Sequence, residues 1–88
     1  MFIECEDGSL VRASAVRCIR GEYSYKRYTV VLYSGVGQSM IFQSSPEEVN
    51  YDDEVQLRAA QDWARRVSRE VASLIERVAS TKVSSPAG

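Results

Sequence analysis

Residues 53–80 read DEVQLRAAQDWARRVSREVASLIERVAS, and this stretch decides the fold. It contains neither Pro nor Gly, so it predicts one uninterrupted helix about 42 Å long. Its apolar residues recur at alternating spacings of three and four, which is a heptad pattern. The seam consists of Leu57, Ala60, Ala64, Val67, Val71, Leu74 and Val78, and it is widened on its two sides by Trp63 and Ile75.

The predicted helix is about twice as long as a strand of five or six residues, which spans about 17 to 20 Å. The chain's own sheet can therefore cover only part of the apolar face, and we expect a second copy to cover the C-terminal half. A kink that folds the helix back on itself is the alternative. The expected homodimer interface comprises Trp63, Val67, Val71, Leu74, Ile75 and Val78.

Two helix starts precede this stretch. Ser45-Pro46-Glu47-Glu48 has the order of a capping box with Pro at the first helical position. The run of residues 50–54 offers a second start, with Asp52 or Asp53 as the cap. We expect a short turn of helix, a bend near Asn50 and then the long helix; one continuous helix is the alternative.

The first 45 residues have the composition of β-structure. Asp7-Gly8 predicts a tight hairpin turn, and Gly21 is expected to end a strand. Tyr28-Thr-Val-Val-Leu-Tyr33 carries β-branched, aromatic or aliphatic side chains on both faces, which predicts a central strand. The expected strands cover residues 1–6, 9–13, 15–20, 28–33 and 39–43.

Together these elements predict one α+β domain over residues 1–80. An antiparallel β-meander of four to five strands within residues 1–45 packs against one long C-terminal helix within residues 46–80. The polar tail, residues 81–88, is expected to be disordered.

The composition excludes most kinds of active site. The 88 residues include no His, so Ser/His and Cys/His catalysis and His-containing zinc sites are excluded. Cys5 and Cys18 are expected to be buried free thiols; a disulfide, or a metal site shared between chains, is the alternative. We therefore expect a protein that is not an enzyme, with no catalytic, cofactor-binding or metal-binding residue.

No run of residues is apolar enough to span a membrane, and acidic residues appear by the fourth position, unlike in a secretory signal. These features predict a cytoplasmic protein that has no contact with a membrane.

Two surfaces are candidate partner-binding sites. Tyr23, Tyr25 and Arg27 would project together from an exposed strand, as a protein interface, a set of cross-strand pairs or, with Lys26, a base-stacking platform. On the helix, opposite the seam, Arg58, Arg65 and Arg69 form either an anion-binding stripe or a solvated face with weak ion pairs to acidic neighbours.

The formal net charge of −1 conceals a separation of charge along the chain. Residues 46–54 contain five acidic and no basic residues, whereas residues 55–88 contain six basic and three acidic ones. Such separation can orient a partner or a second copy.

Over residues 2–49, the order of the predicted elements resembles that of short bacterial and phage proteins of the flagellar FlbD type. The order is a strand, the Asp7-Gly8 turn, Ser9-Leu-Val-Arg-Ala-Ser-Ala-Val16, the central strand, a Gly turn, a strand and Ser45-Pro-Glu-Glu-Val49. The resemblance implies a hairpin, further strands and a C-terminal helix, and it assigns no site residue.

From size and the lack of catalytic motifs, we expect a regulator, inhibitor or adaptor that binds another protein and is encoded by a phage or mobile element. The alternative is a nucleic-acid-binding module that uses the helix arginines and the Tyr/Lys/Arg strand.

Overall fold

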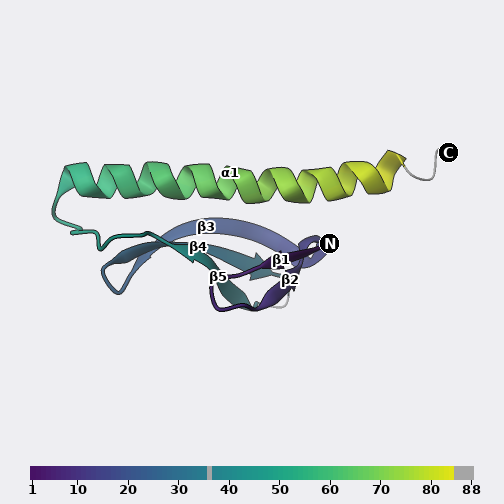
Figure 1. Ribbon diagram of the computed structural model, residues 1–88, viewed down its shortest axis with the longest axis horizontal. Coiled ribbons are helices and arrows are strands. Elements are labelled where there is room, and N and C mark those ends of the chain that lie inside the picture. Colours follow the sequence, from purple (N-terminus) through teal and green to yellow (C-terminus); the bar gives the residue numbers. More distant parts are fainter. Residues whose placement is uncertain (36, 85–88) are drawn as a thin grey trace.

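The computed structural model describes residues 1–35 and 37–84, with side chains of the helix described as far as Arg77. Within these residues, antiparallel strands pack against one long C-terminal helix (Figure 1), so the predicted α+β fold is confirmed. The elements are β1 (Phe2–Glu4), β2 (Leu10–Arg12), a 3-10 turn (Ala13–Ala15), β3 (Val16–Ser24), β4 (Arg27–Ser34), β5 (Ser39–Ser44) and α1 (Glu54–Ser84).

The strands form two sheets instead of the single meander that the sequence predicts. β1 and β2 make a short hairpin, and β3, β4 and β5 make a separate sheet with β4 in the centre. The 3-10 turn separates the two sheets along the chain. The prediction that residues 28–33 form a central strand is confirmed, because β4 is hydrogen-bonded to a strand on each side.

β3 continues through Gly21 to Ser24, so the prediction that Gly21 ends a strand is wrong. The chain reverses at Tyr25 and Lys26, whose φ angles are 51° and 64°. A two-residue hairpin turn of type I′ requires positive φ at both central residues, because its twist then matches that of the strands. The local sequence hid this turn, since neither residue is Gly, Asn or Asp.

The core lies between the three-stranded sheet, the hairpin and α1. Ile3 of the hairpin and Leu32 of β4 belong to one buried cluster with Val71 of α1. Nearer the start of the helix, Val30 of β4 packs against Ala64. These contacts fix the helix along the sheet.

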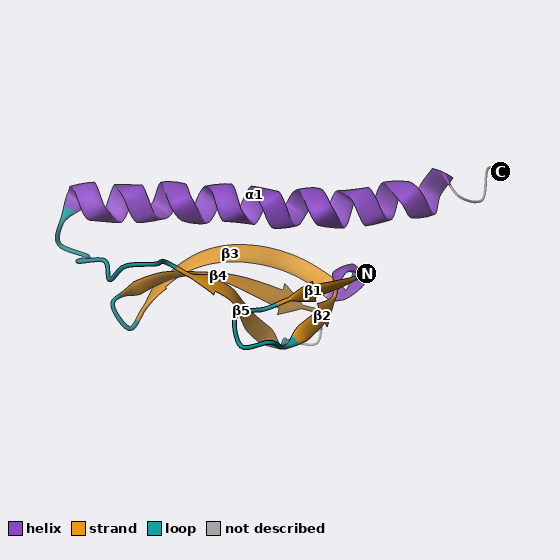
Figure 2. Cartoon of the chain, viewed as in Figure 1, coloured by secondary structure: helices purple, strands orange, loops and turns teal. Residues whose placement is uncertain are grey.

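Residues 46–53 form a loop (Figure 2), so the predicted helix start at Ser45 and Pro46 is wrong. Ser45 is buried, and its hydroxyl accepts a hydrogen bond from the backbone N–H of Tyr28 and donates one to the carbonyl of Glu47. Its side chain is therefore committed to the sheet and cannot cap a helix.

The second predicted helix start is confirmed, with Asp53 as the cap. One oxygen of its carboxylate accepts hydrogen bonds from the backbone N–H groups of Val55 and Gln56, at 3.0 and 3.2 Å. The negative charge also lies at the positive end of the helix dipole. At the other end α1 continues to Ser84, beyond the predicted end at Ser80. Residues 85–88 of the predicted tail lie outside the described residues.

The heptad seam is the face of α1 that packs on the chain's own sheet. Ala60, Ala64, Val67 and Val71 are all buried within one copy. Figure 1 shows that the C-terminal part of the helix continues past the sheet. No helix in the described part of the chain is long and apolar enough to cross a membrane.

Candidate functional site

The loop that follows β5 is fastened to the β3–β4 hairpin at Ser45. The backbone N–H of Ser45 donates to the carbonyl of Tyr28 at 2.7 Å, and Nη1 of Arg27 donates to the carbonyl of Ser45 at 2.7 Å. The carbonyl of Tyr28 and the guanidinium of Arg27 therefore hold Ser45, the residue before the loop, in a fixed position.

The other end of the loop is fastened to the same hairpin at Val49, which is buried. Its N–H donates to the carbonyl of Lys26 at 2.6 Å, and its carbonyl accepts from the hydroxyl of Tyr23 at 2.7 Å. The ring of Tyr23 also contacts that of Tyr51, with 5.2 Å between the centroids. The hairpin tip thus acts as a clamp on residues 45–49.

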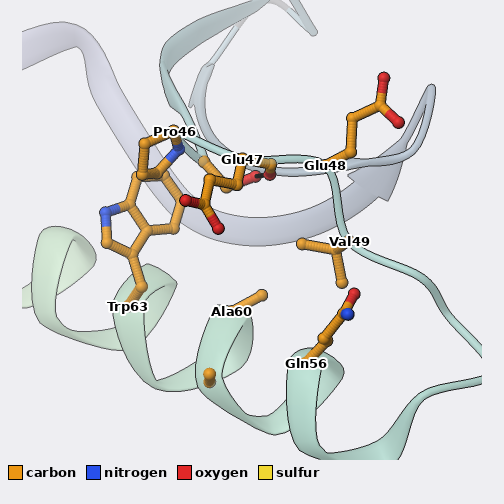
Figure 3. Close-up of a pocket in the computed structure, with 9 residues that line it drawn as sticks. Pro46, Glu47, Glu48, Val49, Gln56, Ala60 and Trp63 are labelled. Atoms are coloured by element: carbon orange, nitrogen blue, oxygen red, sulfur yellow. Dashed lines mark hydrogen bonds between the residues drawn. The ribbon is translucent and has the colours of Figure 1, made fainter.

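Between this clamped loop and the first half of α1 lies a groove of about 280 Å³. Figure 3 shows Trp63 reaching from the helix toward Pro46, and Val49 lying across from Ala60. Most of its lining surface is apolar. The lining residues are Ser45, Pro46, Glu47, Glu48, Val49, Gln56, Ala59, Ala60 and Trp63.

The edge of the groove is acidic. Glu47 and Glu48 are exposed and come from the loop, directly beside Pro46 and Val49. They belong to the run of residues 46–54 that contains five acidic and no basic residues. An apolar floor with carboxylates on its edge attracts an apolar group that carries a positive charge beside it.

The structure does not bring Tyr23, Tyr25 and Arg27 together on one exposed strand face, so that prediction is wrong. Tyr23 and Arg27 bind the backbone of Val49 and Ser45 and have a structural role. Tyr25 lies at the hairpin tip and is 96% exposed. Only Tyr25 remains available to a partner as the sequence predicts.

The predicted arginine stripe is exposed. Arg58, Arg65 and Arg69 lie on the solvent side of α1 and do not line the groove. Arg65 lies 3.8 Å from Asp62, with both side chains more than half exposed, so this ion pair contributes little to stability. The geometry agrees with the expectation of a solvated face, and it leaves the cations accessible to an anion.

The residues predicted for a dimer interface lie in different environments in the structure. Val67 and Val71 are buried against the chain's own sheet, so they are not available to a second copy. Trp63 lines the groove, while Leu74 and Ile75 are half-buried. Val78 lies outside the residues whose side chains are described.

Both cysteines are free, but Cys18 is exposed and not buried as predicted. Cys5 is in the core, and burial together with the nearby charge of Asp7 raises the pKa of its thiol. Within the described residues, no three Cys, Asp or Glu side chains are grouped so that they could hold a metal ion.

The sequence matches no protein-family model, and neither the curated proteins nor the solved structures include a significant match to it.

Sequence reasoning missed the groove because it placed residues 46–49 in a helix. These four residues, Pro46 to Val49, are four of the nine that line the groove. The competing signal was present in the sequence, since Asp53 also offers a cap, and two caps eight residues apart leave the segment between them open to either structure.

Proposed function

We propose that this domain is a small non-enzymatic binding protein that acts on another protein as a regulator, inhibitor or adaptor through the groove between residues 45–49 and α1. The observation that supports this is the apolar floor, with Trp63 at one end, beside the exposed carboxylates of Glu47 and Glu48. Apolar pockets that contain Trp and are rimmed by charge are typical of protein interaction sites.

The size of the groove fits a side chain better than a whole small ligand. Its volume of about 280 Å³ lies just below the range of about 300 to 1,000 Å³ found for small-molecule sites. A partner segment that inserts one apolar side chain next to a Lys or Arg would complement both the floor and the acidic edge. We propose that the protein meets this partner in the cytoplasm.

Affinity capture from the native host, followed by mass spectrometry, tests this proposal when wild type is compared with Glu47→Lys/Glu48→Lys. The variant reverses the charge of the edge at two exposed positions and leaves the apolar floor intact. Glu4→Lys/Asp62→Lys is the matched control, because it makes the same change in net charge at exposed positions that do not line the groove.

We expect wild type and the control to retain the same protein partner and Glu47→Lys/Glu48→Lys to lose it. Equal recovery by all three proteins shows that the groove is not the binding site.

The alternative function is nucleic-acid binding, which is favoured by the exposed row of Arg58, Arg65 and Arg69. Their charge would attract phosphates, although the acidic run of residues 46–54 opposes this. A salt titration separates the two functions. Binding to phosphates weakens steeply with added salt through counterion release, whereas docking in the apolar groove, with one partner cation at the acidic edge, weakens much less.

The proposed binding unit is a homodimer. The short chain buries a limited core on its own, and a second copy is the economical way to extend it.

A further inference from the structure

The two edges of the three-stranded sheet differ. At the β5 edge, the N–H of Glu6 donates to the carbonyl of Ile41 at 3.3 Å, and its carboxylate accepts from the N–H and the hydroxyl of Ser44 at 3.1 and 2.9 Å. The hairpin and its turn therefore occupy that edge. In the described part of the chain, β3 pairs only with β4 and leaves its outer edge free.

The free edge is long and carries few features that prevent pairing. β3 has nine residues, with neither Pro nor Lys, and its one irregularity lies near its start, between Val16 and Cys18. Natural proteins usually protect such an edge with Pro, Lys, a bulge or a very short strand. From Cys18 to Ser24 the edge has no bulge, and its two charges, Arg20 and Glu22, are of opposite sign, so this segment is a site for the addition of another strand.

The register of β3 against β4 identifies the groups on the free edge. Ser24 and Arg27 flank a two-residue turn, so they form a hydrogen-bonded pair. Because hydrogen-bonded and non-hydrogen-bonded pairs alternate along an antiparallel ladder, the backbone groups of Ile19, Gly21 and Tyr23 point outward. Arg20 and Glu22 lie between them, with side chains on the sheet face away from α1.

We infer that β3 pairs antiparallel with β3 of a second copy about a two-fold axis at Gly21, which makes a continuous six-stranded sheet. This inference rests on the proposed homodimer and assigns its interface. In this register Arg20 lies directly opposite the partner's Glu22, and the reverse pair is formed by symmetry.

Charge selects this register over its neighbours. An axis at Arg20 would place two arginines opposite one another, and an axis at Glu22 would do the same with two glutamates. Opposite charges across a ladder are stabilising and like charges are destabilising. On the face toward α1, Ile19 lies opposite the partner's Tyr23, which is a favourable apolar pair.

The helices leave room for this pairing. α1 packs on both β3 and β4. A helix centred over such a pair has its axis about 4.8 Å from a two-fold axis beside the outer strand. The two helices would then lie about 9 to 10 Å apart on the same side of the sheet, which is an ordinary packing distance. On the side of α1 toward the free edge, Ala72 lies beside Cys18 and Ile19. Ser68, one turn earlier, is also small, and the longer Gln61 and Arg65 on this side are exposed.

Sedimentation velocity of the full chain, at micromolar and higher concentrations, tests the inference with charge variants. We expect Arg20→Glu and Glu22→Arg each to weaken the dimer by about tenfold or more, because each turns two attractive pairs into repulsive ones. Arg20→Glu/Glu22→Arg should restore it. Arg66→Glu, on the solvent side of α1, is the matched control and should leave the dimer unchanged.

A cross-link checks the register independently. The proposed axis places Cys18 opposite the partner's Ser24, so Ser24→Cys should form a disulfide-linked dimer under mild oxidation. Wild type should not, because its two Cys18 residues would be about 20 Å apart. Circular dichroism confirms that each variant is folded.

Two results overturn the inference, and they separate failure of the β3 interface from failure of the homodimer itself. A dimer that persists in Arg20→Glu shows that the copies associate through another surface, and the homodimer stands. A wild-type monomer of 9.9 kDa at every concentration removes the homodimer as well, and the binding groove is tested separately.

Discussion

A Cβ atom built on Gly21 would lie 3.1 Å from the Cβ atom of Ala64 and 3.0 Å from Cε1 of Tyr28. β3 and α1 therefore approach each other at a point where one side has no side chain and the other has only a methyl group. The ring of Tyr28 fills the remaining space. Gly21 is a packing residue in the middle of a strand and not a strand breaker.

Gly21→Val should destabilise the fold by about 1 to 3 kcal/mol, because the added methyl groups must displace α1 or Tyr28. Urea denaturation measures the change in the free energy of unfolding. Gly35→Ala is the control, since a Cβ there meets only the flexible side chain of Arg17. Wild-type stability in Gly21→Val would show that the helix does not depend on this contact.

Asp53→Ala should lower the free energy of unfolding by about 1 kcal/mol, because the N–H groups of Val55 and Gln56 lose their acceptor. Asp53→Asn should retain most of the stability, because an amide oxygen also caps. Asp52→Ala is the control at the neighbouring position, whose backbone N–H donates to Asn50 and whose carboxylate accepts no hydrogen bond from the described residues. Thermal and urea denaturation monitored by circular dichroism provide the comparison; equal losses at both positions would contradict Asp53 as the cap.

Tyr25→Asn/Lys26→Gly should stabilise the protein by about 1 kcal/mol. Both positions have positive φ, which is costly for Tyr and Lys, whereas Asn-Gly is the preferred pair for a type I′ turn. The hydrogen bond from Val49 is retained because it reaches the backbone of Lys26. A higher midpoint in urea confirms the turn type, and a lower midpoint contradicts it.

Tyr33 should make stability fall at alkaline pH. Its hydroxyl donates to Oε1 of Glu22 at 2.7 Å, and this bond to a carboxylate raises the pKa of Tyr33 above its ordinary value of 10.0. The raised pKa means that the folded state favours the protonated phenol. Its contribution is therefore complete below the unfolded-state pKa and is lost as pH rises through the folded-state pKa.

Urea denaturation from below to above pH 10 compares wild type with Tyr33→Phe. The difference in stability between the two should shrink as the phenol ionises. A difference that stays constant across this range contradicts the bond to Glu22.

Arg27→Met should loosen the candidate groove, because the carbonyl of Ser45 loses its hydrogen bond from the guanidinium. Trp63 is the only Trp in the chain and lines the groove, so its fluorescence reports the change directly. We expect a shift of the emission to longer wavelength as water reaches the indole. Arg12→Met, on the hairpin, should leave the spectrum unchanged, and an equal shift in both variants would contradict a local effect.

The sequence by itself determined the elements whose signal is local and repeated. The spacing of apolar residues from Leu57 to Val71 identified the helix and its buried face, and the run of residues 28–33 identified the central strand. The helix prediction succeeded because burial on one face imposes a period on the sequence that persists over several turns. The strand prediction succeeded because burial on both faces leaves a continuous apolar run.

Tertiary structure alone decided the roles of Ser45 and Gly21 and formed the groove. The cap at Ser45 lost to the one at Asp53 because hydrogen bonds to Tyr28 and Glu47 occupy the hydroxyl of Ser45. Gly21 continues a strand because Ala64, distant in sequence, lies above it. The groove exists only because Tyr23 and Arg27 clamp residues 45–49 beside α1. Each of these outcomes depends on a partner far along the chain, and a local pattern cannot encode it.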